Sequence, residues 1–118
     1  MSFPMASLVP TNEDITGSSS PVPFGRLLDE EERRREKAAL ATALDPQGDG
    51  LTVRWENTKT GSIGAITALG RAYPFDGKVC RAFVGDLKRG ELHKTMKATA
   101  CTVAAGDWAV RDVEAPKG

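Results

Sequence analysis

VCRAFVGDLKRGELHKTMKATACTV, residues Val79–Val103, is the stretch of this chain that decides its fold. Apolar and polar residues alternate along both of its arms, Val79–Leu87 and Leu92–Val103, as they do in strands that bury one side of a sheet. A charged, glycine-containing segment separates the arms, which is the pattern of a β-hairpin. The stretch therefore predicts two antiparallel strands joined by a tight turn.

Two cysteines fix the expected register of this hairpin. Directly opposed residues in a hairpin have a constant sum of positions, so Cys80 and Cys101 face each other if the turn is centred on Gly90-Glu91. A two-residue loop with glycine first is the type II′ pattern, which places the turn at the same residues. Opposed Cα atoms lie about 4.5–5.5 Å apart, within the range of a disulfide.

The cysteines have three possible chemical roles. The geometry favours a Cys80–Cys101 disulfide, which is typical of oxidising compartments. The alternative is a pair of free thiols that pack as small core residues. A metal site needs more ligands than two cysteines and the single histidine supply, so neither a metal nor a cofactor is expected.

The residues on either side of the hairpin predict one helix and further strands. Asp29 and Glu32 have the capping-box spacing at the start of a helix over residues 27–44, whose charged first turns should face solvent while Leu40 and Leu44 dock. The other expected strands are Leu51–Glu56, Ser62–Leu69 with a bulge or close approach at Gly64, and a short one at Trp108 and Val110; residues 70–77 form a long connection. We therefore expect an α+β fold in which one N-terminal helix packs on a five-stranded, mostly antiparallel β-sheet or small barrel.

The 118 residues suffice for one domain. Residues 1–25 hold four of the seven prolines and a run of three serines, so they are expected to be a disordered tether, with a docking peptide as the alternative. The domain itself is expected over residues 26–113, and residues 114–118 as a C-terminal tail.

Charge excludes a strong general bias toward nucleic acid, because 16 basic residues balance 16 acidic ones. The halves differ, however: residues 1–50 carry nine acids and five bases, whereas residues 51–118 carry seven acids and eleven bases. No apolar run is long enough to cross a membrane, and Met1 is followed by no signal-peptide pattern. An exported protein with this sequence would have lost its export segment.

No catalytic pattern stands out. Residues 45–56 come close to a calcium loop, but Gln47 is a poor ligand and the segment after Gly50 alternates like a strand, so a helix stop and turn is favoured. His93 lies on the strand face of Cys101, with no nucleophile or orienting carboxylate at a suitable spacing. Trp55 and Trp108 are expected in the core rather than stacked on a ligand. The chain is not expected to be an enzyme.

Four motifs in order resemble the C-terminal domain of the bacterial 17-kDa surface-antigen type of envelope lipoprotein. The resemblance covers residues 38–112, with Thr102 and Ala68 where the family has arginine and proline. The motifs are Trp55-x-Asn57-x-x-Thr60-Gly61-x-x-Gly64-x-Ile66-Thr67, Val79-Cys80-Arg81-x-Phe83, Thr99-Ala100-Cys101 and Gly106-x-Trp108.

This resemblance implies a non-enzymatic protein of the outer membrane or periplasm of a Gram-negative bacterium. Family members carry a lipid on an N-terminal cysteine, so Met1 would stand where that cysteine was and the lipid would be the only membrane contact. The expected role is a binding or structural module for an envelope protein or an anionic envelope polymer. Its candidate binding surface is basic: Arg54, Arg81, Lys94 and Lys97.

The alternative function is a small periplasmic inhibitor of a hydrolase such as lysozyme. An inhibitor needs an exposed loop that reaches into an active site. Residues 70–77, with Tyr73 and Phe75, are the candidate for that loop.

Overall fold

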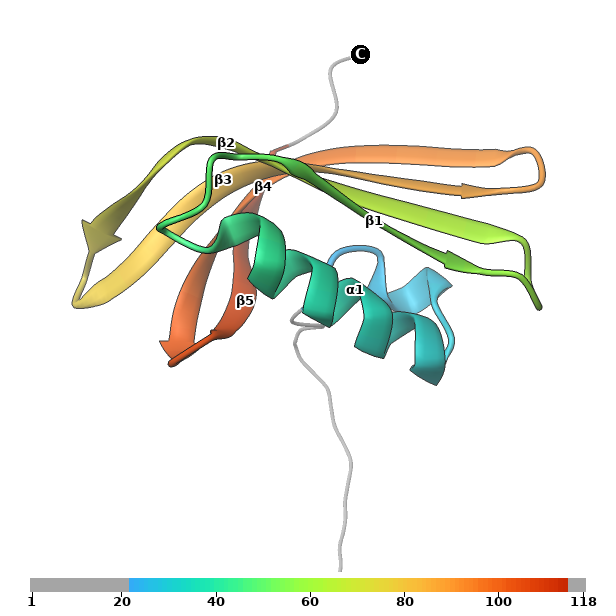
Figure 1. Cartoon of the computed structure of the whole chain (residues 1–118), viewed down its shortest axis with the longest axis horizontal. Helices are drawn as coiled ribbons and strands as arrows, with labels where there is room; N and C mark the ends of the chain where they lie inside the picture. Colours follow the sequence, from blue (N-terminus) through green and yellow to red (C-terminus); the bar gives the residue numbers. More distant parts are fainter. Residues whose placement is uncertain (1–21, 115–118) are drawn as a thin grey trace, which may run out of the picture.

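The computed structural model describes residues 22–114, in which one helix packs across one face of a five-stranded sheet (Figure 1). The fold is α+β, as predicted. A 3₁₀ turn, η2, precedes the helix, and all strands follow it. The elements are η2 (Gly25–Leu27), α1 (Glu30–Leu44), β1 (Thr52–Asn57), β2 (Ser62–Phe75), β3 (Lys78–Arg89), β4 (Leu92–Ala104) and β5 (Asp107–Val113).

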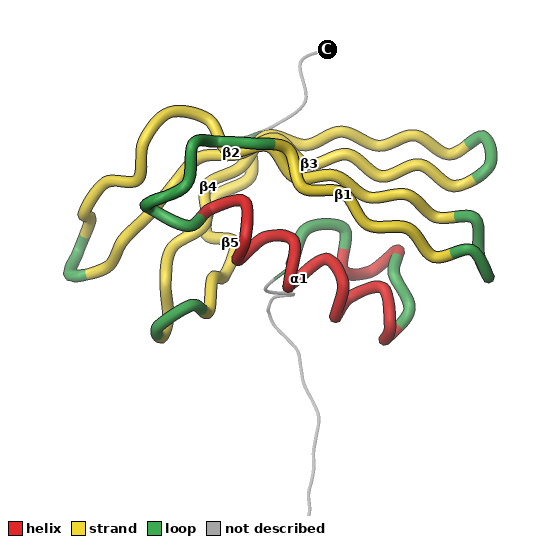
Figure 2. Tube along the Cα trace, viewed as in Figure 1, coloured by secondary structure: helices red, strands yellow, loops and turns green. Residues whose placement is uncertain are grey.

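The sheet is an open meander in the order β1-β2-β3-β4-β5, and each strand runs antiparallel to the next (Figure 2). Strands β1 and β5 form the two edges, so the sheet does not close into the barrel that was the other expected form. Each pair of neighbouring strands is consecutive in sequence, which requires only short turns between them.

Helix α1 begins where the capping box predicts. The Asp29 carboxylate accepts a hydrogen bond from the Glu32 amide at 2.8 Å, and the Glu32 carboxylate accepts one from the Asp29 amide at 3.1 Å. The predicted cap at Asp29 is thus confirmed, and the helix starts directly after it at Glu30, inside the broader range of 27–44 that was expected. None of the described helices is long and apolar enough to cross a membrane.

The core lies between α1 and the facing side of the sheet. Leu40 and Leu44 are fully buried there, as predicted, against Ile66, Phe83 and other apolar residues of the strands. The tightest approach is the Trp55 ring on Gly64, where an added Cβ would lie 2.2 Å from the indole. Only glycine fits at that position of β2, so the predicted close approach is confirmed.

The expected connection over residues 70–77 is wrong, because β2 continues to Phe75. A bulge between Leu69 and Tyr73 takes up the extra residues and keeps β2 paired with β3 as far as Phe75 and Lys78. The turn that follows is Asp76-Gly77, with φ of 53° and 75° as a type I′ hairpin turn requires. Gly70 lies in the bulge, and Pro74 lies in a part of β2 that pairs with β3 but not with β1. These two residues therefore do not indicate a loop here.

The N-terminal boundary of the domain also differs from the expected one. Val22 and Pro23 are buried, and Phe24 packs against the core beside Gly85. Residues 22–25 therefore belong to the folded domain, because the side chains of Val22 and Pro23 are buried in it and Phe24 packs against its core. The rest of the expected tether, residues 1–21, and tail residues 115–118 lie outside the described residues.

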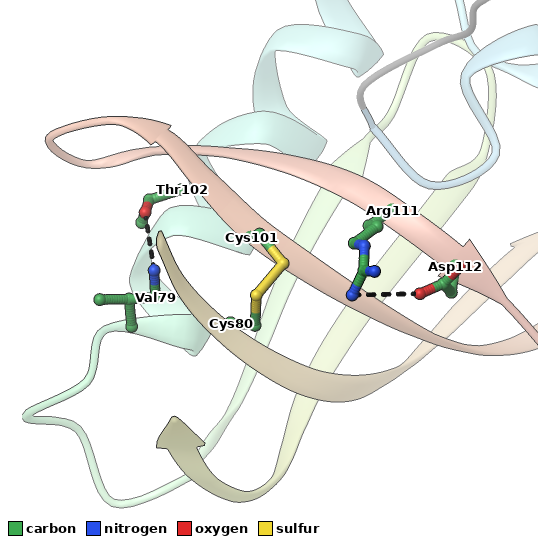
Figure 3. The surroundings of a disulfide bond; sticks show 6 residues. All are labelled: Val79, Cys80, Cys101, Thr102, Arg111 and Asp112. Atoms are coloured by element: carbon green, nitrogen blue, oxygen red, sulfur yellow. Dashed lines mark hydrogen bonds and ion pairs between the residues drawn. A yellow bond between two sulfur atoms is a disulfide. The ribbon is translucent and has the colours of Figure 1, made fainter. Parts of the chain in front are cut away.

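The predicted hairpin register is confirmed. Cys80 pairs with Cys101 and the register runs unbroken to Arg89 and Leu92, around the turn at Gly90 with its φ of 58°. The two cysteines form a disulfide, with Cα atoms 4.0 Å apart (Figure 3). Beside the disulfide, the Val79 amide of β3 donates a hydrogen bond to the Thr102 hydroxyl of β4 at 3.2 Å.

Removing the disulfide should destabilise the domain without changing its fold. The chain-entropy account of a loop of this size predicts that Cys80→Ala/Cys101→Ala loses about 3 kcal/mol of unfolding free energy. Urea unfolding followed by circular dichroism measures this loss. The native chain with a reducing agent is the control, since it should lose a similar amount; an unchanged midpoint in both samples would contradict the structural role.

Candidate functional site

Beneath helix α1 lies a buried carboxylate, that of Glu32, which is 1% exposed. Besides the Asp29 amide of the capping box, it accepts hydrogen bonds from the Asn57 amide at 3.0 Å and from the Thr60 hydroxyl. An Arg89 nitrogen from the far end of β3 lies 3.5 Å away. One carboxylate thus ties together the helix, the turn between β1 and β2, and β3.

These donors decide the ionisation of Glu32. Burial raises the pKa of its carboxyl, but hydrogen bonds from Thr60, the Asp29 backbone, Ser62 and Asn57 together bring that pKa below 4.5. The fold therefore stabilises the charged form of this side chain.

One turn further along α1, Glu36 is in the opposite situation. It is fully buried, and its Oε1 accepts a hydrogen bond from the Trp55 indole nitrogen at 2.7 Å. Its Oε2 has no hydrogen-bond partner among residues 22–114. Burial raises the pKa of this carboxyl to about 7, although the indole hydrogen bond opposes the shift.

The first two turns of the helix were expected to face solvent, but Glu32 and Glu36 in these turns are buried. Both lie on the helix face of Leu40 and Leu44, at intervals of four residues. The four-residue spacing could have predicted that both glutamates are buried. A run of charged residues usually indicates a solvated helix face, however, and that interpretation was preferred. The partners that make burial tolerable come from strands far along the chain.

The other face of the sheet, here called the outer face, points away from α1. Because side chains alternate along a strand, residues that neighbour the buried Trp55 and Leu87 point outward. The register brings these outward residues into rows across four strands. One row is Arg54, Ala65, Asp86 and Thr95; the next is Glu56, Ile63, Lys88 and His93; a third is Thr52, Thr67, Val84 and Lys97.

A shallow hollow of about 430 Å³ lies on the outer face. Its floor is Gly64 and Ala65, and its rim carries Arg54, Lys88 and His93. Within the described part of the chain, neither Arg54 nor Lys88 has an acidic partner. The hollow therefore presents two positive charges without an ion-pair partner, beside one acidic residue of its lining.

Asp86, the one acidic residue at this hollow, is already engaged. Its carboxylate accepts a hydrogen bond from the Thr95 hydroxyl at 2.7 Å, and His93 Nε2 lies 3.4 Å from the same oxygen. His93 shares the outer face with Cys101, as predicted. The Asp86 carboxylate offsets one of the two positive charges that Arg54 and Lys88 bring to the hollow, so the excess there is one positive charge.

The four basic residues of the predicted binding surface do not lie together. Arg54 and Lys97 are on the outer face, although Lys97 lies 3.7 Å from Glu114. Lys94 pairs with the buried Leu87 and so points to the opposite face. The basic residue that lines the same hollow as Arg54 is Lys88, which was not among the predicted residues.

Arg81 is not a surface residue, which corrects its place in the predicted binding surface. It is 4% exposed, and its guanidinium donates to three backbone carbonyls: Gly70 at 3.1 Å, Asp45 at 2.7 Å and Gly48 at 3.5 Å. It faces the helix side because it neighbours Cys80 of the outer face.

The predicted aromatic pair lies beside the hairpin turn at the end of β2. Tyr73 and Phe75 are 41% and 44% exposed. The Arg111 guanidinium of β5 sits 4.1 Å above the centre of the Phe75 ring, a cation–π contact. The pair is accessible, but on a strand end rather than on the long loop that was expected.

The segment with the calcium-loop pattern folds as a turn followed by a strand. Glu56 lies in β1, as the alternation predicts. Among residues 22–114, no group of three or more histidine, cysteine, aspartate or glutamate side chains is placed to hold a metal ion.

The buried glutamates give the domain two opposite pH dependences. Folding raises the pKa of Glu36 from 4.5 to about 7, so this residue costs stability as the pH rises through that interval. Glu36→Gln should therefore gain about 2–3 kcal/mol relative to the native chain between pH 4 and pH 8. Urea unfolding at each pH measures the difference.

Glu32→Gln is the matched control, because folding lowers its pKa below 4.5. Its charged form stabilises the fold above that pH, and the benefit is lost as the pH falls through the folded pKa. The variant should lose most stability near neutral pH and less in acid. If both variants changed in the same direction with pH, the assigned environments would be wrong.

No protein-family model matches this chain, and no curated protein or solved structure is significantly similar to it. The resemblance of its motifs to the surface-antigen domain therefore stays a prediction. What supports a function is the arrangement of the described residues: a helix side that holds the core, and an outer face with a hollow whose two cations lack an ion-pair partner.

Proposed function

We propose that this chain is a non-enzymatic binding module of the cell envelope, which engages an anionic envelope component through the outer face of its sheet. The observation that carries the proposal is the hollow between Arg54 and Lys88. Two cations there lack an acidic partner within residues 22–114, on a sheet face that α1 does not cover. Such a surface attracts phosphate- or carboxylate-bearing polymers.

Two further features support an envelope location. The Cys80–Cys101 disulfide is of the kind that persists in oxidising compartments such as the periplasm. The motif resemblance implies an exported lipoprotein of the outer membrane or periplasm. A lipid anchor on the native N-terminus would then hold the domain at the membrane.

The binding is expected to be electrostatic and modest in strength. Exposed cations on a flat sheet contribute little individually, because water and salt screen them. A polymer with repeated anionic groups compensates by engaging several sites at once. The small, apolar centre of the outer face, with Ile63 and Ala65, adds contact area for such a ligand.

Lipopolysaccharide, a phosphate-bearing envelope polymer, is the probe for this proposal. The chain should bind it in about 50 mM NaCl and release most of it in about 500 mM NaCl, since added salt shortens the screening length. Arg54→Glu/Lys88→Glu should abolish binding because it reverses both charges of the hollow. Equilibrium binding to immobilised lipopolysaccharide measures both effects.

Arg26→Glu/Arg33→Glu is the control, because it makes the same charge change away from the outer face. It should bind nearly as well as the native chain. The proposed surface would be contradicted if the affinity did not change with salt concentration. It would also be contradicted if Arg54→Glu/Lys88→Glu and Arg26→Glu/Arg33→Glu lowered the affinity equally.

The alternative, inhibition of a hydrolase, is favoured by one observation: two exposed aromatic residues beside a hairpin turn. Tyr73 and Phe75 are placed to enter a cleft of another protein. If this is the function, the chain should inhibit a lysozyme in a cell-wall lysis assay, and Tyr73→Ala/Phe75→Ala should not. Lack of inhibition by the native chain would remove this alternative.

A further inference from the structure

A second hollow, of about 520 Å³, lies between the loop that joins α1 to β1 and the bulge of β2. Its polar side chains are Gln47 and Asp49 from the loop, Arg71 from the bulge, and Arg81 from β3. The volume falls within the range of small-molecule sites in proteins.

The wall of this hollow contains a buried cation. Arg81 is 4% exposed, and its three hydrogen bonds go to the carbonyls of Asp45, Gly48 and Gly70. These bonds use three of the five N–H groups of a guanidinium. The two remaining N–H groups have no acceptor within residues 22–114.

The charge of Arg81 is only partly balanced. No carboxylate of residues 22–114 forms an ion pair with it, and buried charges normally have a charged partner. Carbonyls at the end of α1 supply a fraction of a negative charge, about half a unit for a whole helix end. With Arg71, Arg81 and Asp49 in its lining, the hollow therefore has an excess of one positive charge, and Arg81 has no ion-pair partner among the described residues.

The other charged residues of the hollow define what it can accept. Arg71 is exposed and has no hydrogen bond or ion pair with other described residues, so it is available to a ligand. Asp49, also exposed, can accept hydrogen bonds from hydroxyl groups, and the Gln47 amide can both donate and accept. The lining thus combines two anion-binding groups with groups suited to hydroxyls.

We propose that this hollow binds a small sugar, or a similar polyhydroxylated molecule, that carries one carboxylate or phosphate group. The anionic group lies between Arg71, which offers paired N–H donors, and Arg81, which offers its two remaining N–H groups. The hydroxyls lie against Gln47 and Asp49. Arg81 is preorganised because its carbonyl contacts hold the guanidinium in place before the ligand arrives.

This site is separate from the outer face. Arg81 points to the helix side of β3, whereas Arg54 and Lys88 point outward from the sheet. The small-molecule proposal therefore stands or fails independently of the polymer-binding function.

Chemical-shift mapping of the ¹⁵N-labelled full chain tests the proposal with three probes: glucuronate, glucose 6-phosphate and glucose. Saturable shifts are expected around residues 46–49 and 70–72 with one or both acidic sugars. Neutral glucose should produce weak shifts or none. The two acidic probes distinguish a carboxylate ligand from a phosphate ligand.

Arg71→Ala should weaken the binding of the acidic sugar by about tenfold or more, since it removes a charge-assisted hydrogen-bond donor. Arg54→Ala, on the outer face, should leave it unchanged. Arg81→Lys keeps the charge but loses the fork of donors; it should bind more weakly even where its thermal midpoint shows that it is folded.

Three results would overturn the proposal. One is the absence of saturable shifts at residues 46–49 and 70–72 with either acidic sugar. Another is an affinity that Arg71→Ala leaves unchanged. Shifts that are equal for glucose and glucuronate would also contradict it, because the two arginines would then have no role.

Discussion

The Glu32 carboxylate is the contact on which the arrangement of this domain depends. It closes the capping box that starts α1, and it also accepts hydrogen bonds from Asn57 and Thr60 at the turn between β1 and β2. Arg89 approaches it from the end of β3. A buried charge is tolerated only where such donors surround it, so the helix has one favourable position on the sheet. Apolar contacts alone would specify that position less sharply.

Because α1 packs on one face of the sheet, the two faces differ in burial and in charge. The helix side holds the core, the two buried glutamates and Arg81, which lines the second hollow. The outer face is free of α1 and carries Arg54 and Lys88 around its own hollow. The disulfide crosslinks β3 to β4, the strands that carry Lys88 and Lys97, and so holds the register that sets those side chains in their rows.

Much of the fold could be predicted because its signals are local. The turn at Gly90-Glu91 and the positions of the cysteines determine the register of β3 and β4, and the capping box determines the start of α1. The burial of Glu36 and Arg81 could not be predicted in this way. Their partners lie 19 positions away for Glu36, and 11, 33 and 36 positions away for Arg81, so only the assembled fold reveals them. The extension of β2 was missed because its bulge contains the residues that usually indicate a loop.

If this chain binds an envelope polymer, the outer face of the sheet, and not the helix side, should contact it. Hydrogen exchange of the backbone amides, with and without lipopolysaccharide, locates the contact. We expect slower exchange at the residues of the outer face around Arg54, Ala65 and Lys88, with little change along α1. Protection confined to α1, or spread evenly over the whole domain, would contradict this expectation.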